Sequence, residues 1–174
     1  RSKMQLTRPL EKHHNRAKFD CGNESLNRYI REVASQDVKR GISYCWVLAN
    51  DKDDIVGYYT LSNSIIRIEN LPLDLKKSFP KSGMEFPATL IGRLARDLNV
   101  KSKGIGGILL MEALELCYKV ANSEIASIGV LVDPIDEKAI AFYRQFGFEM
   151  LPDIKRMFLP MGVVRKLIEG GKNL

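Results

Sequence analysis

Alternating runs of apolar and polar residues predict strands and helices in a mixed order along the chain. Period-two alternation and short apolar runs between turn residues indicate strands, whereas apolar residues three and four positions apart indicate helices. We expect strands at Met4–Leu10, Ser43–Ala49, Ile55–Leu61 continuing over Ser64–Ile68, Thr89–Leu98, Ser127–Val132, Phe148–Leu151 and Arg156–Leu159. We expect helices from Asn23 or Ser25 to Lys39, from Ile108 to Ala121, from Asp133 or Asp136 to Phe146, and from Met161 to Ile168.

This order of elements is typical of an α/β fold. Strands come first, and strand-helix alternation follows. A chain of 174 residues at 45% apolar content is long enough to bury one sizeable core. We therefore expect a single domain over residues 1–174, with a flexible tail from about residue 169. The segment Leu71–Pro87 contains three prolines and is expected to be a loop with at most one short helix.

Charge and cysteine content narrow the classes of partner. The formal net charge of +6 favours a polyanionic partner over a neutral one. The three cysteines are odd in number and widely spaced, without a Cys-x-x-Cys or Cys/His metal pattern, so we expect reduced thiols and no metal site. No signal peptide is recognised, and no apolar run approaches the ~18 residues of a membrane span. A cytoplasmic protein without a membrane partner is expected.

The strongest chemical signal is a basic, glycine-rich turn between the fourth expected strand and its helix. It comprises Lys101, Ser102, Lys103, Gly104, Ile105, Gly106 and Gly107. Glycines let the backbone approach a ligand closely, and a helix N-terminus adds about half a positive charge. The turn thus suits a phosphate or pyrophosphate, although a tight turn with a solvated rim fits the same residues.

Two common phosphate-binding motifs do not match this turn. The P-loop spacing Gly-x-x-x-x-Gly-Lys-Ser/Thr is absent. A Rossmann fingerprint is also excluded, because Gly107 directly follows Gly106 and no acidic strand end lies about twenty residues on.

The turn resembles the acyl-CoA pyrophosphate loop of the GNAT N-acetyltransferases, Arg/Gln-x-x-Gly-x-Gly/Ala, with Lys101 in place of the first residue. Asp136 to Phe148 is similar to the C-terminal signature Ala-x-x-Phe-Tyr-x-x-x-Gly-Phe of that family. Phe19 to Leu26 and the run Arg93-Leu94-Ala95 resemble one subgroup, the GNAT toxins of bacterial toxin–antitoxin pairs.

This resemblance implies a GNAT fold, with a mixed, mostly antiparallel sheet, splayed central strands and flanking helices. It implies an enzyme that takes acetyl from acetyl-CoA and caps the α-amino group of an amino acid esterified to tRNA, which stops translation. A ribbon-helix-helix antitoxin and a homodimer are the expected protein partners.

The resemblance also implies roles for individual residues. Tyr143 is expected to protonate the departing CoA thiolate as the general acid. The expected acetyl-CoA contacts are Leu94, Ala95, Arg96, Lys101, Ser102, Lys103, Gly104, Ile105, Gly106, Gly107, Ala139, Phe142 and Tyr143.

The expected central strand offers Gly92, Arg93, Leu94 and Ala95 at the position where many GNAT enzymes that act on lysine carry a catalytic carboxylate, and Glu85 lies outside the strand. A lysine amine is only ~0.04% neutral at pH 7, whereas an α-amine with a pKa near 8 is ~10% neutral. The missing base therefore favours an α-amine substrate. Glu24, Glu69, Asp97 and Asp133 remain alternatives that the fold decides.

Eight basic side chains are candidate contacts to tRNA phosphates. They are Arg28, Arg31, Lys39, Arg40, Lys76, Lys77, Lys81 and Arg93. The neighbours His13 and His14 are expected to be solvated. Two other functions stay open: a GNAT enzyme acting on a small amine or a protein amino group, and a catalytically silent CoA-binding or repressor-complex subunit.

Overall fold

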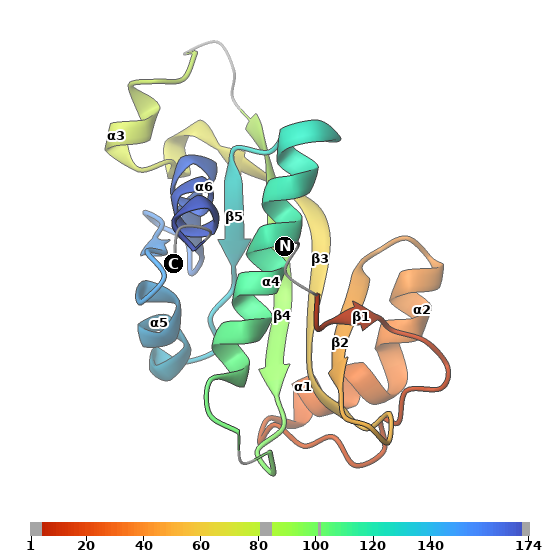
Figure 1. The fold of residues 1–174 in the computed structure, drawn as a ribbon. Helices are drawn as coiled ribbons and strands as arrows, with labels where there is room; N and C mark the ends of the chain where they lie inside the picture. The colour runs from red at the N-terminus through yellow and green to blue at the C-terminus, as the bar shows by residue number, and fades with distance from the viewer. Residues whose placement is uncertain (1–4, 81–84, 101, 172–174) are drawn as a thin grey trace. The chain divides into compact units, whose positions relative to one another are not determined.

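The computed structural model describes residues 5–80, 85–100 and 102–171. The chain divides into two compact units. Figure 1 labels the helices and strands along the chain. The first unit contains Arg1–Ser62 and Gly92–Ala113, and the second contains Asn63–Ile91 and Leu114–Leu174. The prediction of a single domain stays a prediction.

Across the described residues the strands form a seven-stranded sheet in the order β1-β2-β3-β4-β5-β7-β6. The strands are β1 Arg8–Pro9, β2 Tyr44–Ala49, β3 Ile55–Arg67, β4 Glu85–Arg96, β5 Gly129–Val132, β6 Glu149–Met150 and β7 Met157–Pro160. β1 with β2, β2 with β3, β5 with β7 and β6 with β7 pair antiparallel, whereas β4 and β5 are parallel. The predicted mixed α/β sheet is confirmed.

The helices follow the predicted order, with two additional short turns. They are α1 Glu24–Arg28, the π-helix η1 Tyr29–Val33, α2 Ala34–Lys39, the 3-10 helix η2 Ile68–Asn70, α3 Leu73–Lys76, α4 Ile105–Ser123, α5 Glu137–Arg144 and α6 Met161–Gly170. Asn23 caps α1 by accepting the Leu26 N–H, at 3.1 Å. Asp136 caps α5 in the same way. The helix predicted from Asn23 or Ser25 to Lys39 is therefore present, but the π-helix η1 interrupts it.

The core of the first unit lies between the α1–α2 segment and the strands β2 and β3. Phe19, Tyr29, Ile30 and Tyr58 are all buried there. The rings of Phe19 and Tyr58 meet edge to face, with centroids 5.4 Å apart. Burial of large aromatic groups contributes most of the packing energy in such a cluster, and it fixes α1 against the strands.

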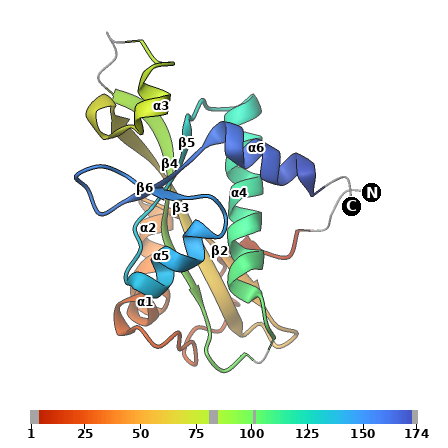
Figure 2. The same cartoon turned by 90° about the vertical axis from the view of Figure 1, so that its left-hand side faces the viewer.

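A second core, in the second unit, joins the far ends of β3 and β4 to β5 and β7. Ile66, Leu71, Leu131 and Phe158 are buried in it. α6 packs against β5 and β7 (Figure 2). Gly129 of β5 leaves room for the Phe158 ring of β7, since a Cβ built at Gly129 would lie only 2.3 Å from that ring.

Several predicted boundaries were wrong. β4 begins at Glu85 rather than Thr89, so the predicted loop Leu71–Pro87 is too long, and Glu85 is part of the strand. Pro87 lies within this strand, and its carbonyl accepts the Ile128 N–H at 2.9 Å. α4 begins at Ile105, three residues early. α6 continues through Gly170, past the predicted start of the tail.

His14 also differs from its prediction, because it is buried rather than solvated. Its Nδ1 accepts the Glu11 N–H at 3.0 Å, and burial lowers the pKa of its imidazole. His13 is exposed, as predicted.

Candidate active site

The central strand β4 has an open backbone edge. β5 pairs with β4 only at Thr89–Ile91 and ends at Val132, so β4 runs on to Arg96 beyond its described pairing with β5. The Asp97 N–H donates to the Val56 carbonyl of β3 at 2.9 Å. Because the backbone groups of successive strand residues point to opposite edges, those of Leu94 and Arg96 face the open edge. This geometry favours Leu94 and Arg96 over Ala95 as backbone contacts, and Ala95 is buried in the first core.

The turn after β4 leads directly into the N-terminus of α4. Gly104 has a φ of 83°, in the left-handed region that favours glycine. The helix begins at Ile105, and its first intrahelical bond runs from the Ile108 N–H to the Gly104 carbonyl, at 3.0 Å. The preceding N–H groups have no partner within the helix, and the first turn carries no acidic residue. This end of the helix therefore fits an anion.

The predicted phosphate contacts lie around this turn. Ser102, Lys103 and Gly104 are exposed, and Gly106 and Gly107 are half-buried in the first helical turn. The predicted contact Lys101 lies outside the described residues. The fit to a pyrophosphate thus depends on backbone N–H groups and on the Lys103 charge.

A polar network ties the start of α1 to the end of β4. Asp97 is buried, and its Oδ2 accepts the Asp20 N–H at 3.1 Å, while the Leu98 N–H donates to the Asp20 carbonyl at 2.9 Å. Asp20 Oδ1 accepts bonds from the Gly22 N–H and from Asn27 Nδ2. These bonds, the first above all, lower the pKa of the Asp20 carboxyl.

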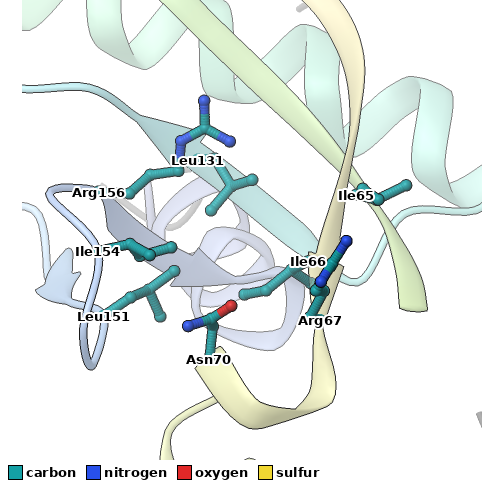
Figure 3. A pocket seen from close by; sticks show the side chains of 8 residues that line it. All are labelled: Ile65, Ile66, Arg67, Asn70, Leu131, Leu151, Ile154 and Arg156. Atoms are coloured by element: carbon teal, nitrogen blue, oxygen red, sulfur yellow. The ribbon is translucent and has the colours of Figure 1, made fainter. Parts of the chain in front are cut away.

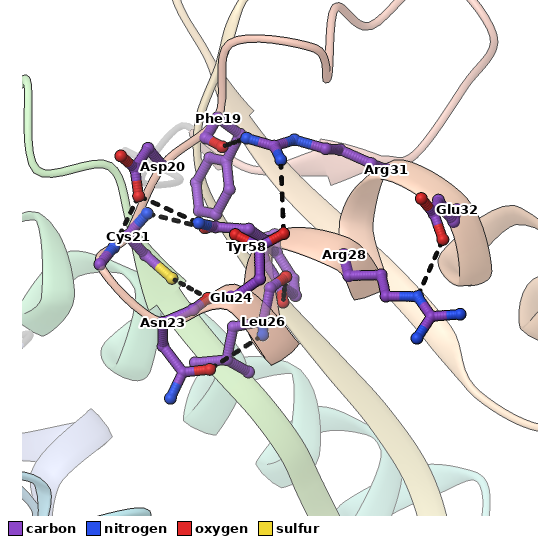
Figure 4. A network of polar contacts seen from close by, with 12 residues as sticks. Phe19, Asp20, Cys21, Asn23, Glu24, Leu26, Arg28, Arg31, Glu32 and Tyr58 are labelled. Atoms are coloured by element: carbon purple, nitrogen blue, oxygen red, sulfur yellow. Dashed lines mark hydrogen bonds and ion pairs between the residues drawn. The ribbon is translucent and has the colours of Figure 1, made fainter.

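Figure 4 shows how this network continues along α1. Cys21 donates its N–H to the Asn27 side chain at 2.8 Å, and the Tyr58 hydroxyl donates to the Leu26 carbonyl at 2.7 Å. The segment Phe19–Leu26, which the resemblance singled out without roles, therefore holds α1 beside the open part of β4 within the first unit.

Arg93 extends from β4 onto the π-helix. Its guanidinium lies over the Tyr29 ring, 3.6 Å from the ring centroid. The Tyr29 hydroxyl donates to Asp37 Oδ2 at 3.0 Å. Cation–π contact of this kind contributes about 0.5–2 kcal/mol, so it holds the Arg93 guanidinium over the Tyr29 ring.

Tyr143 lies on α5, in the second unit. The Asp136 cap starts the helix by accepting the Ala139 N–H at 2.7 Å, so that N–H is not free for a ligand. The Tyr143 ring meets the rings of Phe142 and Phe148 edge to face, at 5.2 and 5.4 Å. Burial, with a smaller contribution from the Asp133 carboxylate, raises the pKa of the Tyr143 phenol. The phenol therefore stays protonated throughout the neutral range.

Most of the carboxylates proposed as alternative bases already form hydrogen bonds or lie close to a guanidinium group within the fold. Both oxygens of Asp97 accept backbone N–H groups. Asp133 forms a two-bond ion pair with Arg156, at 2.7 and 3.1 Å. Glu24 lies 3.9 Å from the Arg31 guanidinium, and Glu69 is exposed.

Glu85 is nine residues from Leu94 along the strand, which corresponds to about 30 Å. It lies 3.9 Å from the Arg67 guanidinium. The separation of about 30 Å between Glu85 and Leu94 argues against Glu85 as a base at the open edge.

The predicted tRNA contacts divide between the two units. Arg28 pairs with Glu32 at 2.9 Å, and Arg31 donates to the Phe19 carbonyl. Lys76 donates to the Glu69 carbonyl at 3.0 Å. Lys39, Arg40 and Lys77 are exposed and form no ion pair among the described residues. Lys81 lies outside the described residues.

Sequence reasoning missed two features that only the fold assembles. The bond from Asp97 to Asp20 joins residues 77 positions apart, and the Asp133–Arg156 ion pair joins residues 23 positions apart. No local motif signals either contact.

Within the described part of the chain, no group of three or more His, Cys, Asp or Glu side chains is arranged to hold a metal ion. No helix there combines the length and apolar character that a membrane span requires.

Two known proteins are similar to this sequence over most of its length. The probable toxin TacT of Sinorhizobium fredii (strain NBRC 101917 / NGR234) is 28% identical over 172 residues, which cover 94% of each chain. The tRNA-acetylating toxin of Mycobacterium tuberculosis (strain ATCC 25618 / H37Rv) is 32% identical over 151 residues, or 86% of this chain and 88% of that one.

Solved structures share the fold. A tyrosine-to-phenylalanine mutant of KacT aligns with a TM-score of 0.83 at 26% identity, covering 94% of this chain and 99% of that one. AtaT complexed with acetyl-methionyl-tRNAfMet aligns with a TM-score of 0.84 at 25% identity, covering 93% and 98%. AtaTR bound with AcCoA aligns with a TM-score of 0.80 at 25% identity, covering 93% and 96%. The predicted GNAT fold is thus confirmed.

The matching sequence profile of this fold spans residues 8–148, which include the open strand, the glycine turn and Tyr143. The chain belongs to the Acetyltransferase (GNAT) family.

Proposed function

We propose that the protein is an acetyl-CoA-dependent toxin that acetylates the α-amino group of aminoacyl-tRNA. The observation that carries this proposal is the 32% identity to a tRNA-acetylating toxin over 86% of the chain. The open edge of β4, the anion-binding end of α4 and the protonated phenol of Tyr143 provide the groups that acetyl transfer requires.

Acetyl-CoA would supply the acetyl thioester. The N–H groups at the start of α4, together with Lys103, suit its pyrophosphate. The free backbone of Leu94 and Arg96 suits its amide-containing arm and can polarise the thioester carbonyl. The likeness to AtaTR bound with AcCoA supports the same co-substrate here.

The reaction forms an N–C bond and breaks the C–S bond of the thioester. The neutral α-amine attacks the carbonyl carbon, and the Tyr143 phenol donates its proton to the departing sulfur. The proton lost from the amine nitrogen restores the phenol, so the products are an N-acetylated aminoacyl-tRNA and CoA thiol. An α-amine near pKa 8 is ~10% neutral at pH 7, which is consistent with the occupied carboxylates of Asp97 and Asp133.

Positive charge in both units supports a nucleic-acid substrate. Arg93 is fixed by Tyr29 on the open strand, and exposed Lys39, Arg40 and Lys77 add sequence-independent attraction to phosphates. Lysines and arginines already paired within the fold, such as Arg28 with Glu32, contribute less to binding.

We infer a cytoplasmic protein that a ribbon-helix-helix antitoxin neutralises, and that forms a homodimer. The similarity to the probable toxin TacT supports a toxin, which the cell that makes it has to neutralise. Co-expression with the neighbouring open reading frame, followed by light scattering of the complex and of the toxin alone, tests the partner and the dimer.

The test of function is transfer of labelled acetyl from acetyl-CoA to total aminoacylated tRNA. Deacylated tRNA and a lysine-rich peptide are the controls. Label on charged tRNA alone is the expected result. Label on the peptide alone would assign a protein acetyltransferase instead, and binding of acetyl-CoA without any transfer would assign a small-molecule enzyme or a silent CoA-binding subunit.

A further inference from the structure

Arg156 of the second unit has its counter-charge within the fold. Figure 3 shows this arginine beside a small cavity of about 170 Å³, which Ile66, Leu131 and Leu151 also line. The half-buried Arg156 makes two bonds to Asp133, at 2.7 and 3.1 Å. An external anion would therefore compete with the Asp133 carboxylate for this guanidinium.

Arg93 on β4 is also half-buried, but its guanidinium has no counter-charge among the residues that the structure describes. Its contact within the fold is with the face of the Tyr29 ring, 3.6 Å from the centroid. A ring covers only the face of the planar guanidinium, whereas the N–H donors point outward in its plane. Arg93 directly precedes Leu94, whose backbone faces the open edge of β4. A half-buried cation without a partner is costly, so we expect an anionic ligand beside this edge.

The Arg93 guanidinium lies on the face of the sheet opposite α4. Successive strand residues point to opposite faces. A Cβ at Gly57 would lie 2.7 Å from the Leu109 side chain, so Gly57 of β3 faces α4. Tyr58 faces the other way, and its ring stacks on that of Tyr29 with centroids 6.2 Å apart. Because Arg93 lies over Tyr29, it is separated by the sheet from α4, whose N-terminus suits the pyrophosphate of acetyl-CoA. This placement favours the phosphates of the second substrate.

The π-helix η1 determines how the Tyr29 ring is held. The Tyr29 carbonyl accepts the N–H of Ala34, five residues on, where an α-helix would use the residue four on. In a regular α-helix, side chains eight residues apart lie about 80° apart around the axis. The extra residue of the π turn brings Tyr29 and Asp37 nearly into line, and the Tyr29 hydroxyl donates to Asp37 Oδ2 at 3.0 Å. The ring under Arg93 is therefore fixed at its far end.

We propose that Tyr29 is a positioning residue, whose ring is oriented by the bond to Asp37 and holds Arg93 ready to bind a phosphate of the charged tRNA. The proposal rests on the proposed acetylation of aminoacyl-tRNA and specifies how that substrate is held at the open edge of β4. Tyr29 does not itself touch the substrate. It restricts the Arg93 side chain, so that less conformational entropy is lost when the phosphate binds.

The test is a double-mutant cycle of Tyr29 and Arg93, measured as acetyl transfer to charged tRNA at saturating acetyl-CoA. Tyr29→Leu removes the ring, and kcat/KM should fall about fivefold, as expected for a lost cation–π contact. The loss should lie in KM rather than in kcat, because a phosphate contact stabilises the ground state and the transition state alike. In the Arg93→Ala background, Tyr29→Leu should change kcat/KM by less than about twofold, because no guanidinium is left to position.

Three further substitutions separate positioning from packing. Tyr29→Phe keeps the ring and should retain at least about half of kcat/KM. Tyr29→Met removes the ring while a flexible side chain fills the space, so it repeats the cycle if Tyr29→Leu does not fold. Phe19→Leu is the matched control, because Phe19 is buried in the same cluster and its ring meets that of Tyr58. Any loss that Phe19→Leu causes should be the same with and without the Arg93 guanidinium.

The outcomes separate this proposal from the proposed function. Unchanged kinetics in Tyr29→Leu, additive losses in the cycle, or a Tyr29→Phe activity as low as that of Tyr29→Leu overturns the positioning role, while acetylation of aminoacyl-tRNA stands. A weaker affinity of the same variants for acetyl-CoA, measured by calorimetry, also overturns it, because Arg93 would then serve the co-substrate. Absence of label on any charged tRNA with the unmodified protein overturns both the positioning role and the proposed function.

Discussion

Replacing Tyr143 by phenylalanine removes one hydroxyl and leaves the packing in place. The ring of Tyr143 contacts Phe142 and Phe148 edge to face, with centroids at 5.2 and 5.4 Å, and a phenylalanine ring can keep both contacts. The thermal midpoint should therefore change little. If the phenol protonates the departing thiolate, only the chemical step should slow.

The structure indicates how much slower that step becomes. General acids contribute typically 10²–10⁴-fold. The phenol has a pKa raised above its usual value of about 10, so proton transfer to a thiolate of pKa about 8.5 is uphill by more than 2 kcal/mol. Tyr143 then helps mainly while the C–S bond is breaking, and we expect the lower end of the range. A hundredfold loss in kcat corresponds to about 2.7 kcal/mol.

The assay is single-turnover acetyl transfer to charged tRNA at saturating acetyl-CoA, which excludes product release from the measured rate. Acetyl-CoA affinity is measured in parallel by calorimetry and should change less than threefold. Tyr118→Phe is the matched control, because its hydroxyl contacts Glu169 at 3.2 Å on the surface of the same unit. A Tyr143→Phe rate within threefold of the unmodified protein would refute the general-acid assignment.

Three further outcomes are expected. Asn27→Ala leaves the Cys21 N–H without its partner and should lower the free energy of unfolding, measured by urea titration, by about 1–3 kcal/mol. The control Asn122→Ala, at an exposed position, should change that free energy by less than about 0.5 kcal/mol. Equal effects of the two substitutions would contradict a stabilising role of the polar network. Arg93→Ala should reduce kcat/KM for charged tRNA about tenfold and flatten its salt dependence, with Arg93→Lys retaining most of that salt slope; unchanged kinetics in Arg93→Ala would exclude a substrate role. The value of kcat/KM should rise nearly tenfold per pH unit as the pH approaches the α-amine pKa near 8, because only the neutral amine attacks. It should not fall between pH 8 and 9.5, because the raised pKa of Tyr143 keeps its phenol protonated. A fall in that interval would argue against a protonated Tyr143.

Features governed by neighbours in sequence could be predicted well. Asn23 and Asp136 cap their helices as expected, because a cap needs only a side-chain oxygen and an N–H three residues on. Gly104 takes a positive φ in the expected turn. Motif spacing also placed Tyr143 on a helix, although its contribution to chemistry remains a prediction.

Boundaries failed where a distant segment supplied the missing partner. Pro87 suggested a loop, yet it lies in β4, where its carbonyl accepts the N–H of Ile128, 41 positions later. His14 was expected to be solvated, but the fold buries it. Its ring accepts the N–H of Glu11, only three residues away, so this error concerned burial and not a distant partner. In each case, local polarity was a poor guide to tertiary burial.

The sequence by itself determined the order of strands and helices, their caps, the glycine turn and the family signature. Each of these depends on residues within one turn or one strand of each other. Only the tertiary structure decided that Asp97 binds the Asp20 backbone, that Arg93 stacks on Tyr29, and that Arg156 pairs with Asp133 at the rim of a cavity. These contacts join segments far apart in the chain, and packing of the whole sheet, rather than any local pattern, brings them within bonding distance.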